Sequence, residues 1–348
     1  MRKYIKVINM SILIILSIFM LSCVRSKDNK DDKEIKIGVT LYREDDVFIS
    51  TISNNLEEII KENSDKYDEK IILEVLDAKG NIISQGNQVD KFINQKYDVI
   101  CVNLVDRTAA ATIIDKAKAA DIPVIFFNRE PVEEDMNRWD KVYYVGTQAE
   151  ESAKLQAEIV KENWASNTDF YDKNKDGIIQ YVMLEGEPGH QDSLIRTEYC
   201  IKYLINNDLQ LEKLADDTAN WQSNQANSKM IQWIDKFGDS IEVVFSNNDS
   251  MALGALHAIN LNSDKLRTPI VVGVDGIREA LEEIKLGNMN GTVISDSRAQ
   301  AEGIFKIAMD IIEDGVLNNT ENIKNNKYMR LKHTKVTLDN VDLYLEDK

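Results

Sequence analysis

The 348-residue sequence has few residues of the kinds that make linkers and basic surfaces. It contains only 4 Pro and 15 Gly, which leaves little room for long flexible linkers. No basic stripe occurs beyond the first six residues, and 59 Asp and Glu outnumber 42 Lys and Arg, so the formal charge is −17. Because nucleic-acid binding relies on Lys and Arg contacts to phosphates, this composition excludes nucleic acid as a partner.

Phosphate-binding glycine patterns are also missing. The sequence has neither GxGxxG nor GxxxxGK[ST], the turns whose backbone N–H groups hold phosphates. What is present is ordinary globular material, with 43% hydrophobic residues. At roughly 150 residues per domain, the length predicts two domains, each with its own core.

The first residues predict an export signal. Arg2, Lys3 and Lys6 precede an apolar run that ends at Ser22 and Cys23. A membrane-spanning helix is the alternative, but the run of about 14 residues is shorter than the roughly 20 needed. The end of the run resembles the lipobox of bacterial lipoproteins, which implies a signal peptide at 1–22, lipid modification of Cys23 and a polar tether at 23–34. We therefore expect an exported protein, anchored by lipid at the cell envelope.

Two further cysteines remain, and they leave two possibilities open. An exported protein could join Cys101 and Cys200 in one disulfide bond. Cys101, however, lies in an apolar strand-like run and Cys200 in a helical pattern, which favours two buried thiols.

Strand and helix patterns alternate along the whole chain. The strands predicted from apolar runs are 36–41, 71–76, 98–103, 123–127, 143–147, 179–184, 242–246, 269–274 and 292–294, with helices between them. Such alternation implies parallel sheets with helices on both faces. The predicted fold is α/β, with two doubly wound parallel-sheet lobes.

Short polar side chains gather where these strands stop, which is where open parallel sheets bind ligands. They are Asp45, Asp46, Asn128, Arg129, His190, Asp192, Asn247, Asn248, Asp249, Asp275, Ser295 and Asp296. Any one of them could simply cap a helix. Together they can donate to and accept from many neutral hydroxyls, and Phe48 and Trp221 add aromatic surface, although an isolated Trp is often a core residue. This mixture suits a carbohydrate.

The segment from Asp172 to Gln180 matches the first nine positions of an EF-hand loop. Oxygen-bearing side chains stand at positions 1, 3, 5 and 9, glycine at 6, and Ile178 at 7 offers its carbonyl. Position 12 is Met183 and supplies no carboxylate. A polar turn is the alternative, but a structural calcium site completed from elsewhere in the chain is the better interpretation.

Seven motifs together resemble the galactose/glucose-binding proteins of bacterial ABC sugar uptake. Besides the 172–180 loop they are GVTLY (38–42), FFNREP (126–131), YYVGT (143–147), GEPGHQD (186–192), EVVFSNND (242–249) and GVD (273–275). The resemblance runs from about residue 34 to 315. It implies the type I periplasmic-binding-protein architecture, in which three crossovers join an N-terminal lobe (35–146 plus 296–328) to a C-terminal lobe (147–295 plus 329–348). The lobes would close over the sugar.

Carried over position by position, the resemblance implies two sets of residues. The sugar-binding set is Asp46, Phe48, Asn128, Arg129, His190, Asp192, Arg196, Trp221, Asn248, Asp275 and Ser295. The calcium set is Asp172, Asn174, Asp176, Ile178, Gln180 and, from a distant strand, Glu242. At Ser295 the family has Asn, so one contact is lost or passes through water, and the preference among hexoses is open.

Three functions compete. We expect a monomeric lipoprotein that delivers glucose, galactose or a methyl-galactoside to an ABC permease. A sensor that signals through a membrane chemoreceptor is compatible with that role. A glycosidase would need two carboxylates flanking a glycosidic bond, for which Asp46, Asp192 and Asp275 are candidates; their Arg and Asn partners favour simple acceptors and no enzyme activity.

Overall fold

The computed structural model describes residues 34–67, 69–315, 317 and 323–345. The predicted signal peptide, Cys23 and nearly all of the predicted tether lie outside these residues. Glu34, assigned to the tether, is instead the first residue of strand β1 (Glu34–Leu41). No helix in the described ranges is long and apolar enough to cross a membrane.

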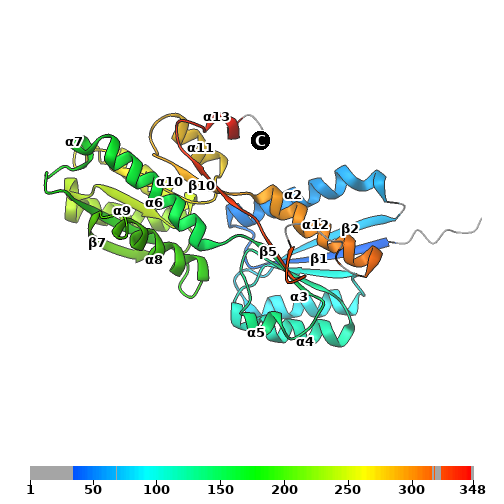
Figure 1. Ribbon diagram of the computed structural model, residues 1–348. Coiled ribbons are helices and arrows are strands. Elements are labelled where there is room, and N and C mark those ends of the chain that lie inside the picture. The colour runs from blue at the N-terminus through cyan, green and yellow to red at the C-terminus, as the bar shows by residue number, and fades with distance from the viewer. Residues whose placement is uncertain (1–33, 68, 316, 318–322, 346–348) are drawn as a thin grey trace, which may run out of the picture.

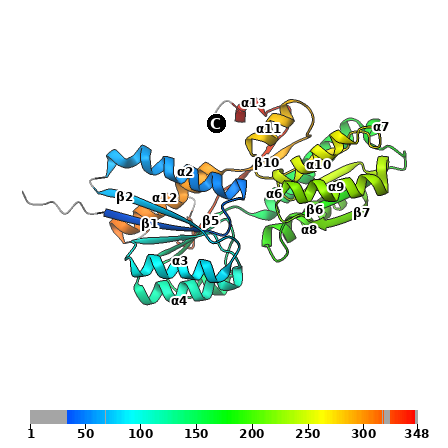
Figure 2. The same cartoon turned by 180° about the vertical axis from the view of Figure 1, so that it is seen from behind.

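Strands and helices alternate as predicted, and they form two lobes (Figures 1 and 2). The remaining strands are β2 (Lys70–Asp77), β3 (Val99–Val102), β4 (Val124–Phe127), β5 (Val142–Gly146), β6 (Ile178–Glu185), β7 (Gln210–Thr218), β8 (Val243–Ser246), β9 (Ile270–Val272), β10 (Thr292–Ser295), β11 (Ile323–Lys324), β12 (Tyr328–Arg330) and β13 (His333–Val336). The α-helices are α2 (Val47–Asn63), α3 (Ile82–Asn94), α4 (Ala110–Ala120), α5 (Glu133–Met136), α6 (Ala149–Ser166), α7 (Thr168–Tyr171), α8 (Gln191–Ile205), α9 (Ser223–Phe237), α10 (Asp249–Leu261), α11 (Arg278–Lys285), α12 (Ser297–Asp314) and α13 (Asp342–Leu345).

The N-terminal lobe is a sheet in the order β11-β12-β5-β4-β3-β1-β2, in which all pairings except β11–β12 are parallel. Helices cover both faces. One core lies between the sheet and α2 and α12, where α2 buries Ile49, Ile52, Leu56 and Ile59 at helical spacing. A second core packs α3 and α4 on the opposite face. This is the predicted doubly wound arrangement.

The C-terminal lobe repeats the plan with the parallel sheet β7-β6-β8-β9. Single parallel bridges link β9 to Gly291 and Asp275 to β10, and β10 pairs antiparallel with β13. Helices α6 and α8 pack on one face, and α9, α10 and α11 on the other. The predicted fold class is therefore confirmed.

Three details differ from the predictions or decide between them. Strand β7 lies between Cys200 and Glu242, where only helix was predicted. Most of its exposed residues are charged, and about half of the strand is exposed, so its sequence lacks an apolar run.

Strand β12 pairs with β5, so Met329 and Arg330 belong to the N-terminal lobe and the third crossover follows Arg330. Cys101 and Cys200 are both free and buried, which confirms the two-thiol alternative.

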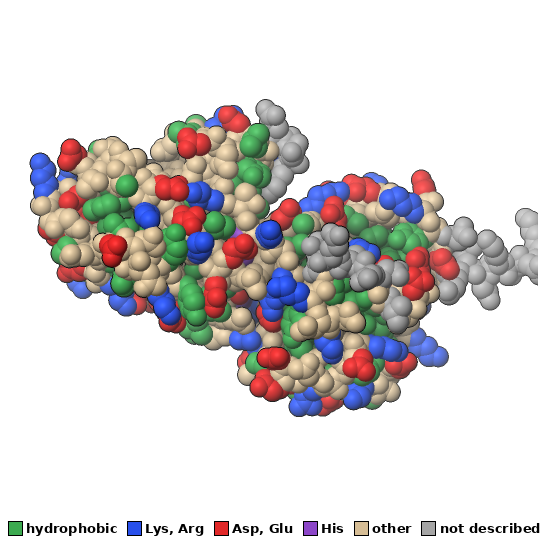
Figure 3. Space-filling model, viewed as in Figure 1, with side chains coloured by type: hydrophobic (Ala, Val, Ile, Leu, Met, Phe, Trp, Pro, Cys, Tyr) green, Lys and Arg blue, Asp and Glu red, His purple; other side chains and the backbone are tan. Residues whose placement is uncertain are grey.

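Acidic and basic side chains are interspersed on the face shown in Figure 3 and form no continuous basic patch there.

Candidate functional site

A pocket that is partly open to solvent lies where strand ends of the two lobes face each other. All of the predicted sugar-binding residues except Ser295 line it. Its complete lining is Tyr42, Asp46, Phe48, Ile49, Asn128, Arg129, His190, Asp192, Arg196, Trp221, Asn248 and Asp275. These residues come from both lobes and follow the carboxyl ends of β1, β4, β6, β7, β8 and β9. The sheets therefore bring together side chains that are up to 233 positions apart, from Tyr42 to Asp275.

Three pocket residues are also N-caps. Asp46 Oδ1 accepts from Ile49 N at 3.1 Å, His190 Nδ1 from Asp192 N at 3.1 Å, and Asn248 Oδ1 from Met251 N at 3.0 Å. Each of these side chains has a second polar atom beyond the one used for the cap. Capping and ligand contact are thus compatible at these positions, because the strand-to-helix junction supplies both.

His190 is neutral and has a defined tautomer. Its Nδ1 accepts a backbone hydrogen bond, so the proton is on Nε2. Burial, together with the positive charges of Arg129, Arg196 and Arg107, holds the pKa of His190 well below its usual value. The ring therefore presents one N–H donor.

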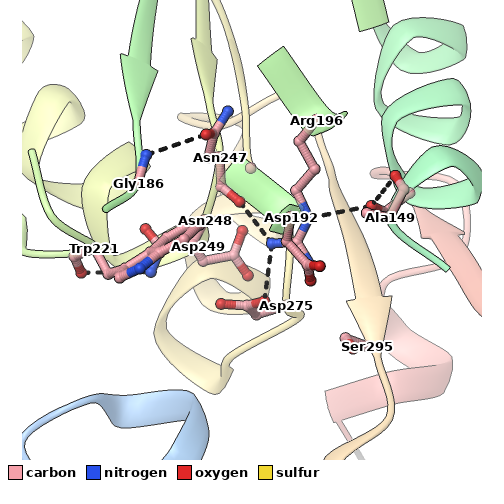
Figure 4. A network of polar contacts seen from close by, with 12 residues as sticks. Ala149, Gly186, Asp192, Arg196, Trp221, Asn247, Asn248, Asp249, Asp275 and Ser295 are labelled. Atoms are coloured by element: carbon pink, nitrogen blue, oxygen red, sulfur yellow. Dashed lines mark hydrogen bonds and ion pairs between the residues drawn. The ribbon is translucent and has the colours of Figure 1, made fainter. Parts of the chain in front are cut away.

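Arg196 links several residues of the C-terminal lobe (Figure 4). Its Nη2 donates to Asp192 Oδ2 at 3.2 Å, its Nη1 donates to the Asn247 carbonyl at 2.9 Å, and Nη1 lies 3.8 Å from Asp275 Oδ1. Burial raises the pKa of both carboxyls, and Arg196 opposes that rise. The guanidinium holds the two carboxyls beside one pocket wall.

Arg129 joins the lobes. Its Nη1 donates to the Val105 carbonyl at 3.0 Å, and its Nη2 forms an ion pair with Glu187 of the C-terminal lobe at 2.6 Å. The guanidinium lies 3.7 Å above the Tyr42 ring. Arg129 Nε is buried and has no hydrogen-bond partner among the described residues. One N–H of this pocket-lining guanidinium is therefore unsatisfied among the described residues.

The two predicted aromatic residues stand in different settings. Phe48 is buried in the N-terminal lobe, whereas Trp221 is half-buried and packs edge-on to His190, with ring centroids 5.0 Å apart. Trp221 has φ 65°, and a side chain at Gly186 would collide with its ring. Trp221 packs against the core cluster of its lobe and also lines the pocket, so both alternatives considered for it apply.

Ser295 does not line this pocket. It lies in β10 opposite His333, and its hydroxyl accepts from Gln300 Nε2 at 3.3 Å. Figure 4 shows it apart from the cluster around Asp275. The short side chain ends within the crossover region, so the family's contact at this position is not reproduced.

Two pocket residues were missed from the sequence, Tyr42 and Ile49. Tyr42 directly follows β1 and donates to Asp46 Oδ2, so it has the strand-end position that marked the other candidates. Ile49 belongs to the apolar face of α2 and carries no polar signal.

The 172–180 loop, between α7 and β6, is built around carboxylates. Asp172 accepts from the backbone N–H groups of Asp176 and Gly177, and Glu242 accepts from those of Lys173 and Gln180, at 2.7–3.1 Å. The distant Glu242 thus lies against the loop, as the resemblance implied. In the described part of the chain, His, Cys, Asp and Glu side chains alone form no group of three placed to hold a metal ion.

Amide orientation decides whether this loop can bind a cation. Asn174 Nδ2 and Gln180 Nε2 donate to Asp176 Oδ2 at 2.8 and 2.9 Å, so the amide nitrogens face the carboxylate. The donor set consists of oxygens of the kind that Ca²⁺ prefers. Turning both amides would bring their oxygens beside Asp176 Oδ2, so the residues fit calcium in kind.

Comparisons with known proteins agree with this geometry. Residues 37–315 match the family described as periplasmic binding protein domain. The chain is 36% identical over 315 residues to the D-galactose/methyl-galactoside binding periplasmic protein MglB of Haemophilus influenzae, covering 89% of this chain and 92% of that protein. It is 25% identical to the ribose import binding protein RbsB of Bacillus subtilis, covering 87% and 92%.

Solved structures show the same fold. An ABC transporter solute binding protein from Bacillus halodurans, with bound myo-inositol, has a TM-score of 0.75 and 28% identity, and the match covers 92% of this chain and all of that one. Together with the family match over residues 37–315, this establishes that the chain belongs to the periplasmic binding protein family.

Proposed function

We propose that the chain is an extracytoplasmic substrate-binding protein that captures a hexose between its lobes and delivers it to an ABC permease. The observation that carries this proposal is the pocket in which residues that follow strand ends of both lobes meet. Relatives over nearly the full length are named as sugar-binding proteins of import systems, and none of those compared above is named as an enzyme. Binding and not catalysis is therefore the role.

The chemistry of the pocket suits a neutral, polyhydroxylated ligand. Donors come from the guanidiniums of Arg129 and Arg196 and from the His190 Nε2–H, and acceptors from the carboxyls of Asp46, Asp192 and Asp275. A hydroxyl can accept from one such group while it donates to another. Phe48 and Trp221 offer apolar surface for the C–H faces of a ring.

Galactose or a methyl-galactoside is the favoured ligand, because the MglB relative, which is named for binding them, shares 36% identity along most of both chains. Glucose is the further candidate that the motifs of the sequence implied. Other relatives and structures carry different sugars and polyols, including ribose and myo-inositol. Ser295 stands where the galactose/glucose-binding proteins that the sequence resembles have Asn, so this position lacks the amide that could both donate to and accept from a sugar. A missing hydrogen bond between neutral groups costs about 0.5–1.5 kcal/mol, so binding should persist with altered preference.

Titration of the purified mature protein tests the proposal. Glucose, galactose, methyl-galactoside, ribose and myo-inositol would be added separately, with heat and tryptophan fluorescence as readouts. We expect saturable binding of at least one hexose, with a fluorescence change from Trp221. If no hexose produces heat or a fluorescence change, the assignment is wrong.

We further propose a structural calcium ion in the 172–180 loop. Asp172, Asn174, Asp176, Gln180, Glu242 and the Ile178 carbonyl would hold it. A bound cation would neutralise the carboxylates there: burial raises the pKa of Glu242, and the nearby charges of Asp172 and Asp176 raise it further.

The place of the protein in the cell is also part of this proposal. The family's name indicates an extracytoplasmic location. A lipid on Cys23 would hold the chain at the membrane beside its permease, and contact with a chemoreceptor would add a sensing role. Mass spectrometry of the amino-terminal peptide from membranes would detect the lipid, and a Cys23→Ala variant found unattached would support the anchor.

A further inference from the structure

Asp249, the first residue of α10, is a fully buried carboxylate that does not line the pocket. Its side chain receives three hydrogen bonds. Oδ2 accepts from the backbone N–H groups of Gly276 and Ile277 at 2.7 and 3.0 Å, and Oδ1 accepts from Thr292 Oγ1 at 2.6 Å. Its own N–H donates to the Val274 carbonyl at 2.7 Å. Four bonds thus connect this residue to the segment on both sides of Asp275 and to the neighbouring strand.

That segment has an unusual backbone. Asp275 has φ 123° and Gly276 has φ 74°, in the region that favours glycine. A non-glycine residue there is strained and persists only where its surroundings hold it. The surroundings here are the carboxylate of Asp249 and the backbone bonds to Val293 and Ser295.

Neighbouring glycines show how closely Asp249 approaches. A Cβ on Gly273 would collide with Asp249 Oδ1, and a Cβ on Gly276 would collide with Ile294. Glycine at position 273 therefore lets the chain approach the carboxylate, and glycine at position 276 lets the turn pass close to Ile294 of β10. The result is a turn that projects Asp275 toward the pocket, near Arg196 (Figure 4).

We propose that Asp249 is a positioning residue, which determines ligand affinity by holding the Asp275 turn in its strained conformation. It touches no ligand itself. The inference deepens the proposed function, since it presupposes that Asp275 contacts the sugar. It also makes a claim about the backbone that is independent of any ligand.

The test is a double-mutant cycle with Asp249→Asn and Asp275→Asn, measured by titration with the hexose that the wild-type protein binds best. Asp249→Asn removes the negative charge that strengthens the two peptide N–H bonds, and its amide nitrogen cannot accept from Thr292, whose hydroxyl would have to turn and accept instead. We expect Asp249→Asn to lower affinity at least tenfold, and to lower it less than twofold further when Asp275→Asn is already present. An equal loss in both backgrounds, or no loss, would overturn the proposal.

A second pair of variants covers the case in which Asp249→Asn does not fold. Thr292→Val removes one of the three donors while it keeps the shape, and Thr292→Ser keeps the hydroxyl. We expect about a threefold loss of affinity for Thr292→Val and wild-type affinity for Thr292→Ser. Equal affinities for the two variants would contradict the role of this hydrogen bond.

A crystal structure of the ligand-free Asp249→Asn or Thr292→Val variant separates this inference from the proposed function. We expect Asp275 to leave the positive-φ region or to occupy two conformations. If Asp275 keeps φ near 123° in the variant, the positioning role fails even when the protein binds a hexose. If the turn changes and no hexose binds the wild-type protein, the proposed function fails instead.

Discussion

Asp46, His190 and Asn248 line the pocket, and each uses one side-chain atom to cap the N-terminus of a helix. The cap fixes the rotamer of the side chain, so the remaining polar atom is held in one direction before a ligand arrives. Preorganised groups lose less conformational entropy on binding than free ones. Placing binding residues at helix N-caps is thus a physical advantage and also a signal that can be found in a sequence.

The lowered pKa of His190 predicts that the stability of the folded protein depends on pH. Its folded-state pKa lies well below 6.5, so below pH 6.5 the unfolded chain binds a proton that the folded chain does not. Stability should therefore be complete above pH 6.5 and fall as the pH decreases, by up to about 1.4 kcal/mol per pH unit for this group. His333, whose pKa is lowered to about 4, acts in the same direction.

Chemical denaturation of wild-type protein and His190→Gln between pH 7.5 and 5 measures the part due to His190. Glutamine can still accept at the cap but does not titrate. We expect the variant's free energy of unfolding to decline less steeply below pH 6.5. The difference between the two slopes should approach the value for uptake of one proton on unfolding. Parallel curves for the two proteins would contradict a neutral buried His190.

At the scale of elements, apolar runs were sufficient to predict the buried strands. Strands β3, β4 and β8 are buried at every position and have nearly uninterrupted hydrophobic sequences. Strand β7 lies at the sheet edge and carries charged, exposed residues instead of an apolar run, so the same criterion misses it. The short β12 depends on a partner, β5, that is far away in the chain, and no local pattern marks it.

The residues of the candidate site that directly follow strands could be predicted from the sequence. Asn128 and Asn248 follow buried strands closely, and their positions can be derived from the alternation. The ion pair between Arg129 and Glu187 and the support that Asp249 gives to Asp275 depend on how distant segments meet. Ser295 is itself the last residue of the buried strand β10, where it pairs with His333 of β13, and it does not line the pocket.

The 172–180 loop yields a prediction for one element. Asp176→Ala removes a carboxylate that would hold the ion, and that also accepts from Ile178 N at 2.7 Å in the loop itself. An ion that binds only to the folded state stabilises the folded state. We therefore expect the melting temperature of the variant in calcium to drop to that of the wild-type protein in chelator. Asp169→Ala, which removes an exposed carboxylate three residues before the loop, is the matched control. A wild-type melting temperature that chelator does not change would exclude the ion.

At the scale of the whole molecule, the pocket is formed by two lobes that have separate cores. Each core cluster consists of residues of one lobe. The chain passes from one lobe to the other only at the three crossovers, which follow β5, β10 and β12 in the described residues. Polar contacts such as that between Arg129 and Glu187 connect the lobes beside the pocket. Inter-lobe surfaces of this polar kind permit relative motion. Ligand affinity should therefore depend on interactions that touch no ligand.

Glu187→Gln tests that dependence. The Arg129 side chain is 6% exposed and that of Glu187 23%, so the ion pair is largely shielded from water. A hydrogen bond between charged groups contributes about 1.5–3 kcal/mol, and a neutral partner retains only part of it. When the lobes separate, water solvates both groups, so the loss falls on the closed state. We expect hexose affinity to fall about tenfold through faster dissociation, with little change in the stability of the ligand-free protein.

Stopped-flow fluorescence and thermal unfolding separate these two quantities. Asp217→Asn is the control, because it removes the same charge from an ion pair with Lys229 that lies within the C-terminal lobe. The control should leave the dissociation rate unchanged. If Glu187→Gln lowers stability without ligand as much as it lowers affinity, the ion pair supports the fold as a whole and does not act through closure. A slower association rate with unchanged dissociation would likewise contradict a contact formed only after the ligand has bound.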